Sequence, residues 1–248
     1  MKKLYIKHII LLNLQKLLGN IFFPFIGCLI VFYFRYFQKY KIPEIKKIRD
    51  YYKSLIKQNK PILICPNHLT MIDSAIIQWA LASNIFYLFH FSKFPWNIVA
   101  KENAEKNIIF RIITFLNKCI LIDRKGTKEH KELILNKLRY VLSKKESVCI
   151  FIEGTRSPTG KLLENQINYG AGQLILDVPE TNVIVIYLRG KHQKTKSDFP
   201  IKNEEFFLRY FTLQPETDKK GLRAQKEITL QILEQLKKFE DEYFSIYQ

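Results

Sequence analysis

From residue 61 onward, short apolar runs alternate with longer segments of helical pattern. Apolar runs of four to eight residues bounded by turn residues are typical of buried strands, whereas apolar residues that recur every three or four positions are typical of helices. Strands that alternate with helices build a mostly parallel sheet, because each parallel connection has to cross over the sheet. The sequence therefore predicts an α/β fold, with helices on both faces of a mostly parallel sheet.

The expected elements follow from these patterns. We expect strands over residues 61–66, 84–91, 119–123, 147–152, 182–188 and 206–213. We expect helices over residues 73–83, 107–116, 129–145, 170–177 and 222–244. No internal repeat or linker divides this region, so residues 48–248 are predicted to form one domain, preceded by a separate helical segment over residues 1–47.

The segment from Leu17 to Phe34 is almost wholly apolar. About 18 helical residues at ~1.5 Å each reach ~27 Å, close to the thickness of a bilayer core. Basic residues flank the segment on both sides, which favours both ends remaining on the cytoplasmic side. Gly19–Asn20 and Pro24 are residues that break helices. We therefore expect a membrane-contacting helical hairpin in one leaflet rather than a single crossing; a buried pair of core helices is the alternative.

Charge points to an anionic partner. The chain has 40 basic and 23 acidic residues, a net charge of +17, and its basic residues are mostly lysines. Lysine acts as a point charge toward phosphates and lipid headgroups, whereas base recognition favours the arginine fork. We find no nucleic-acid-binding motif, so we expect an anionic membrane surface and no nucleic acid as partner. The four cysteines have no paired spacing, which predicts neither a disulfide framework nor a metal site.

Three of the expected strands end in polar clusters. Residues 61–66 lead into Asn67–Asp73, residues 119–122 into Asp123–Arg124, and residues 147–152 into Glu153–Ser157. In open α/β sheets, ligands bind at the carboxyl ends of the strands. These clusters are therefore the candidate functional site.

His68 and Asp73 form the first candidate pair. If His68 stays in the turn and Asp73 begins the helix, the carboxylate can reach one imidazole nitrogen. Such a bond sets the tautomer and leaves the other nitrogen free as a general base. An ordinary alternative is that Thr70 and Asp73 form a helix-capping pair and that His68 is a loop residue.

Arg124 and Arg156 are candidate phosphate ligands, because a guanidinium can bind two phosphate oxygens at once. Gly154 lets the backbone come close to such a ligand. The segment 154–161 is not a nucleotide-binding phosphate loop, since the spacing of its two glycines is too long and Leu162 stands where Ser or Thr is needed. Arg124 paired with Asp123 on the surface is the alternative for the first arginine.

Together, the motifs NHLTMID, ILIDR and FIEGTRS resemble those of the glycerolipid acyltransferase family, typified by lysophosphatidic acid acyltransferases; the resemblance covers about residues 61–188. It implies transfer of a fatty acyl group from acyl-CoA or acyl carrier protein to a lysophospholipid hydroxyl, with no metal, cofactor or covalent intermediate. It further implies His68 as the catalytic base and Asp73 as its partner. The residues that it implies bind or organise the acceptor phosphate are Arg124, Glu153, Gly154, Thr155 and Arg156, with a less certain role for Lys101.

The expected acceptor is 1-acylglycerol 3-phosphate and the expected product phosphatidic acid, formed at the cytoplasmic face of the inner or plasma membrane. Lys118, Ile152 and Asn168 depart from residues common in the family. These departures leave open another lysophospholipid, glycerol 3-phosphate or an amino-acid lipid as acceptor. A non-catalytic basic protein that binds membranes or nucleic acid is the alternative from a different class.

Overall fold

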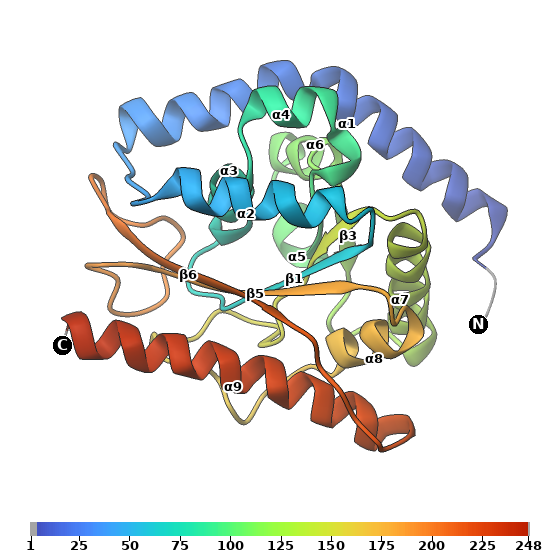
Figure 1. Cartoon of the computed structure of the whole chain (residues 1–248). Coiled ribbons are helices and arrows are strands. Elements are labelled where there is room, and N and C mark those ends of the chain that lie inside the picture. The colour runs from blue at the N-terminus through green and yellow to red at the C-terminus, as the bar shows by residue number, and fades with distance from the viewer. Residues whose placement is uncertain (1–3, 248) are drawn as a thin grey trace.

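Six strands form one sheet in the order β3–β2–β4–β1–β5–β6 in the computed structural model, which describes residues 4–247 (Figure 1). The pairs among β1 to β5 are parallel, and β6 runs antiparallel to β5 at one edge. The strands are β1 (Ile62–Pro66), β2 (Trp96–Ala100), β3 (Cys119–Ile122), β4 (Ser147–Cys149), β5 (Asn182–Gly190) and β6 (Phe206–Leu213). The predicted α/β class is confirmed.

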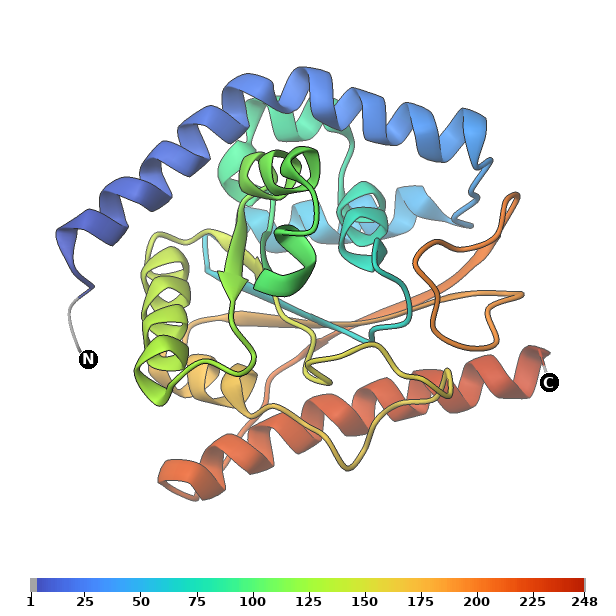
Figure 2. The same cartoon turned by 180° about the vertical axis from the view of Figure 1, so that it is seen from behind.

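Helices cover both faces of this sheet (Figures 1 and 2). One layer contains α1 (Ile6–Phe32), the π-helical turn η1 (Tyr33–Phe37), α2 (Ile45–Lys57), α3 (Asp73–Leu81), α4 (Asn84–Phe89), the short 3₁₀ turn η2 (Phe91–Lys93), α5 (Lys101–Ala104) and α6 (Ile108–Leu116). The opposite layer contains α7 (Lys128–Ser143), α8 (Gly170–Asp177) and α9 (Gly221–Tyr247).

Strand β1 shows why both layers are needed. Leu63 and Cys65 join the apolar core beneath α7, α8 and α9, whereas Ile62 and Ile64 join the core beneath α2, α3 and α4. All four side chains are fully buried. Because neighbouring strand residues point to opposite faces, a continuous apolar run requires cover on both sides. Strand β1 therefore lies in the middle layer of a three-layer molecule.

The strand expected over residues 84–91 is wrong. This segment forms α4 followed by η2, and the missed strand β2 lies just after it. The Ser83 Oγ accepts the N–H of Phe86 (3.2 Å), which caps the start of α4. The Tyr87 hydroxyl donates to the Gln78 carbonyl (3.0 Å) in the core. These contacts favour a helical turn over an extended run.

The turn expected at Gly19–Asn20 or Pro24 is also wrong, because α1 runs through both positions as one helix. Gly19 instead lies against α6: a Cβ atom there would be 2.5 Å from the Leu116 carbonyl oxygen. The glycine thus permits close helix packing, as small residues do at tight contacts. In the described part of the chain, Ile6–Phe37 is the one helix long and apolar enough to cross a membrane.

Candidate active site

The three polar clusters meet at one edge of the sheet. Strands β1 and β4 are neighbours, and β3 lies two strands beyond β4, with β2 between them. His68 after β1, Arg124 after β3 and Glu153 after β4 line the same cavity. The expectation that these strand ends form a single site is therefore met by their positions.

The backbone of His68 is held from both sides. Upstream, the Asn67 side chain donates to the carbonyl of Leu188 (3.1 Å) and accepts its N–H (2.7 Å). The N–H of His68 donates to Glu153 Oε1 (2.8 Å), and its carbonyl accepts the N–H of Ser157 (3.0 Å). A residue with its neighbours bonded in this way presents its side chain in a defined direction, as a preorganised catalytic group requires.

Asp73 contacts the imidazole and the turn at once. His68 Nδ1 lies 3.1 Å from Asp73 Oδ2, and the same oxygen accepts the N–H groups of Leu69 (2.6 Å) and Thr70 (2.8 Å). The Asp73 side chain is 3% exposed and that of His68 16%. The same carboxylate therefore bonds to the turn before α3, as the capping interpretation requires, and to the imidazole, as the catalytic interpretation requires. With Nδ1 donating to Asp73, Nε2 is the nitrogen that can accept a proton.

Phe151 supports the imidazole ring, although the sequence motifs did not mark it as a site residue. Its ring stacks on that of His68 with centroids 4.0 Å apart and planes 25° apart. An aromatic residue two positions before Glu153, at the end of an apolar strand run, was the available signal. The stack limits rotation of the imidazole and shields one of its faces from water.

Glu153 bonds to backbone groups. Its Oε1 accepts the N–H of His68 and its Oε2 the N–H of Leu163 (3.1 Å). Burial raises the pKa of this carboxyl to about 7, although the two N–H donors oppose the shift. Among the two roles considered, binding and organising, these contacts support organising: Glu153 ties the turn after β4 to the turn that carries His68.

This raised pKa predicts a pH-dependent stability. The folded state keeps the Glu153 proton up to about pH 7, whereas the unfolded chain loses it near pH 4. The contribution of this group is therefore full below about pH 4 and is lost as the pH rises through 7. Relative to Glu153→Gln, the free energy of unfolding of the wild type should fall by up to about 3 kcal/mol over this window. Denaturant titrations of both proteins at several pH values measure the difference; a difference that does not change with pH contradicts the prediction.

The turn after β4 requires its glycine. Gly154 has a φ of +65°, which favours glycine, and its N–H donates to the carbonyl of Phe151 (3.0 Å). Thr155, the next residue, lines two cavities that His68 also lines and that are described below. The turn thus brings a hydroxyl and backbone groups close to the imidazole.

The two predicted arginines lie near His68 but differ in their contacts. Arg156 Nη1 donates to the Ser197 carbonyl (2.8 Å) and to Asp198 Oδ1 (2.6 Å). Arg124 Nη1 lies 3.7 Å from Glu102 Oε1, so its ion-pair partner is not the Asp123 that the surface alternative named. A guanidinium has five N–H groups, and the remaining ones can bind a phosphate.

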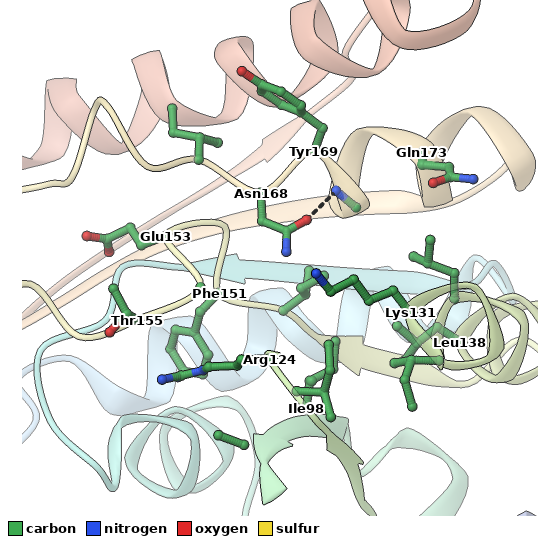
Figure 3. A pocket seen from close by; sticks show the side chains of 18 of the residues that line it. Ile98, Arg124, Lys131, Leu138, Phe151, Glu153, Thr155, Asn168, Tyr169 and Gln173 are labelled. Carbon is green, nitrogen blue, oxygen red and sulfur yellow. Dashed lines mark hydrogen bonds between the residues drawn. The ribbon is translucent and has the colours of Figure 1, made fainter. Parts of the chain in front are cut away.

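Two cavities meet at His68. The first, here named the α7-side cavity, has a volume of about 720 Å³; the second, the α1-side cavity, has about 780 Å³. His68, Phe151, Arg124 and Thr155 line both. Figure 3 shows the α7-side cavity, with Arg124, Phe151 and Thr155 toward one end and Lys131 reaching in from α7. The imidazole is therefore accessible from two directions.

The α1-side cavity has a mixed lining. Residues of η1 and α6, including Tyr33, Phe37 and Phe110, form its apolar wall. Arg156 and Lys196 line the same cavity and carry positive charge. Lys196 lies in the loop between β5 and β6, and no sequence motif indicated it as a site residue. Such a cavity fits a molecule with an apolar chain and an anionic group.

Two other residues named in the sequence have different places. Lys101 begins α5, pairs with Glu105 at 4.0 Å and is not part of the lining of either cavity. Asn168 lines the α7-side cavity, and its Oδ1 accepts the N–H of Gly170 (2.9 Å) at the start of α8. Among residues 4–247, no group of three or more His, Cys, Asp or Glu side chains is placed to hold a metal ion.

Comparison with known proteins agrees with the geometry. A sequence model of a family described as acyltransferase matches residues 47–202, which is more than half of the chain and contains His68, Asp73, Arg124, Glu153 and Arg156. A comparison with curated proteins gave no significant match.

Proposed function

Because the chain belongs to the acyltransferase family of glycerolipid enzymes, we propose that it esterifies a lysophospholipid. The proposed reaction moves a fatty acyl group from acyl-CoA or acyl carrier protein to the free hydroxyl of 1-acylglycerol 3-phosphate and gives phosphatidic acid. The observation that carries this proposal is a histidine, held by a buried carboxylate, at the junction of two cavities. A reaction between two substrates needs a base that both can reach.

The chemistry follows from the positions of the two side chains. His68 Nε2 takes the proton of the acceptor hydroxyl as its oxygen attacks the thioester carbonyl. The new C–O ester bond forms, the C–S bond breaks, and the thiolate leaves with the proton from the imidazolium. Asp73 stabilises that imidazolium and holds its tautomer. No side-chain nucleophile and no acyl-enzyme take part.

The lining of the cavities favours one placement of the substrates. Arg156 and Lys196 line only the α1-side cavity, and Arg124 lies where the two cavities meet. Three cations there suit the phosphate of the acceptor, whose acyl chain would lie along the apolar wall from η1 and α6. The thioester donor would then approach His68 through the α7-side cavity, whose far end contains Lys131 and Gln173.

The proposed location is the cytoplasmic face of the inner or plasma membrane. Buried positions of α1 recur along one stripe from Leu12 to Gly27, so the helix is docked on the domain over this stretch. A helix docked along its length lies parallel to the membrane surface while that contact persists, which favours attachment to one leaflet over a crossing. The excess of lysine supports attraction to anionic lipids.

Replacing Arg156 with Ala should raise the KM for the phosphorylated acceptor roughly 10- to 100-fold, because a charge-assisted hydrogen bond contributes about 1.5–3 kcal/mol. The KM for the thioester donor should change little. Steady-state kinetics with each substrate varied in turn measure both values. Arg223→Ala is the matched control, since Arg223 is an exposed arginine of α9. An unchanged acceptor KM would remove Arg156 from phosphate binding.

An acceptor panel tests the function itself. Purified protein with an acyl thioester is given 1-acylglycerol 3-phosphate, a second lysophospholipid, glycerol 3-phosphate, monoacylglycerol and an amino-acid lipid. We expect the highest kcat/KM with 1-acylglycerol 3-phosphate and the largest loss when its phosphate is removed. A higher kcat/KM with another acceptor would replace the proposed substrate, and salt-dependent DNA binding without any acyl transfer would replace the proposed activity.

A further inference from the structure

Exposed apolar side chains on α4 and α6 lie beside the apolar face of α1. On α4 they are Ile85 and Phe89, and on α6 they are Ile108, Ile109 and Ile112; each is between 52% and 80% exposed. Ordinary surface helices present polar residues to water. α6 instead exposes three isoleucines beside Arg111, and it is also apolar on the face that meets the domain, where Phe110 and Ile113 line the α1-side cavity.

The three helices form one layer. α1 lies across the top of the molecule, with α4 on one side and α6 on the other (Figures 1 and 2). Gln15 of α1 donates to the carbonyls of Phe115 and Cys119 (both 2.9 Å), which fixes α1 against the end of α6. Phe23 of α1 packs on Tyr87 of α4, with ring centroids 6.0 Å apart. α1 therefore packs against both α4 and α6, and all three helices carry exposed apolar side chains.

We propose that α1, α4 and α6 together form a single lipid-binding face that inserts into an anionic monolayer, and that α4 and α6 contribute to binding independently of the N-terminal segment. The exposed residues of this face on α1 and η1 include Phe22, Phe25, Leu29, Phe32 and Phe37. An apolar surface of this extent on three packed helices marks an interaction site.

Charge selects lipid as the occupant. Lys106, just before α6, and Arg111, within α6, are both exposed, and Lys7 and Arg35 lie near the two ends of the α1–η1 helix. A second copy of this chain would bring the same cations, and the same net charge of +17, against them. An anionic monolayer offers apolar chains to the isoleucines and phosphates to the cations.

The α1-side cavity connects this face to His68. Leu29, Phe32 and Phe37 are exposed on the lipid-binding face and also line that cavity. A membrane-resident acceptor would thus enter the cavity from the monolayer without crossing water. This consequence for substrate entry rests on the proposed function, whereas the lipid-binding face itself does not.

The test is vesicle binding by a variant with Ile108→Ser, Ile109→Ser and Ile112→Ser. Co-sedimentation of the full chain with vesicles of phosphatidylglycerol and phosphatidylcholine should show an affinity reduced roughly tenfold or more, because the inserted apolar area is lost. Leu222→Ser, at a similarly exposed leucine of α9 on the other side of the sheet, should bind as the wild type does. A second variant with Ile85→Ser and Phe89→Ser tests α4 separately. It also keeps the proposal testable if the α6 variant folds poorly.

Activity separates this inference from the proposed function. The α6 variant should lose acylation of long-chain 1-acylglycerol 3-phosphate in vesicles but keep acylation of a water-soluble short-chain acceptor. If both the α6 and the α4 variants bind vesicles as tightly as the wild type, the lipid-binding face is overturned. It is also overturned if the wild type is a dimer and either variant becomes a monomer that still binds vesicles normally. Normal vesicle binding by the wild type without any acyl transfer would overturn the proposed function and leave the face intact.

Discussion

Replacing His68 with Ala should lower kcat roughly 10²- to 10⁴-fold, the usual effect of removing a positioned general base. The imidazole is placed for this task by three contacts: the carboxylate of Asp73 at 3.1 Å, the stacked ring of Phe151, and the backbone bond to Glu153. The alanine variant keeps the backbone bonds, so its melting temperature should change little. Steady-state kinetics and thermal melts on both proteins measure the two effects.

His90→Ala is the matched control for this experiment. His90 also stacks on a phenylalanine, Phe86, with centroids 4.5 Å apart, but it lines neither cavity. Its removal should leave kcat unchanged. Full activity in the His68→Ala protein would eliminate His68 as the base, and an equal loss in both variants would assign the effect to general disturbance of the fold.

Replacing Glu146 with Ala should lower the free energy of unfolding by about 3–5 kcal/mol, since it leaves a buried charge without its partner. Lys118 is fully buried, and its Nζ lies 3.0 Å from Glu146 Oε2 and 2.7 Å from the Phe94 carbonyl. Burial lowers the pKa of Lys118 to about 8, and Glu146 opposes that shift. Lys16 of α1 pairs with the other oxygen of the same carboxylate, so Glu146 also ties α1 to the domain.

Denaturant unfolding of three variants tests this buried network. Glu44→Ala is the control, because the Glu44–Lys47 pair is exposed and should contribute about 1 kcal/mol or less. A double variant with Lys118→Met and Glu146→Leu should recover much of the loss, since no buried charge remains at the pair. If Glu146→Ala costs no more than Glu44→Ala, the network contributes nothing to stability.

Lys118 also shows what a departure from the family means physically. It stands where the family often has glycine, and its φ is +55°, a conformation that glycine adopts without strain. Lys118 therefore has a backbone conformation that a glycine at this position would also favour. That side chain is buried against Trp96 and Glu146 instead of entering either cavity.

The α/β fold and the contact between His68 and Asp73 were predictable because both depend on short-range pattern. Apolar runs such as residues 182–188 are too long and too uniformly apolar for a surface strand. His68 and Asp73 are five residues apart across one strand-to-helix turn, so local geometry alone brings them together. Predictions of this kind need no knowledge of distant contacts.

The errors came from long-range packing. Residues 84–91 are apolar throughout, and a run of that length fits a strand or a helix equally well until its neighbours are known. Gly19 was interpreted as a helix breaker, but its neighbour Leu116 is far away in the sequence. Likewise, Ser197 and Asp198 hold Arg156 from a loop more than 40 residues downstream. No local sequence pattern predicts these contacts, because the residues that make them are far apart in the sequence.

The most direct test of the account is whether thiol release from the acyl donor requires the acceptor hydroxyl. Purified protein is given an acyl thioester together with 1-acylglycerol 3-phosphate, or with an analogue in which hydrogen replaces the free hydroxyl. We expect thiol and phosphatidic acid in equal amounts with the true acceptor, and no thiol above background with the analogue. Thiol released at the same rate in both reactions would contradict direct attack by a lipid hydroxyl that His68 activates.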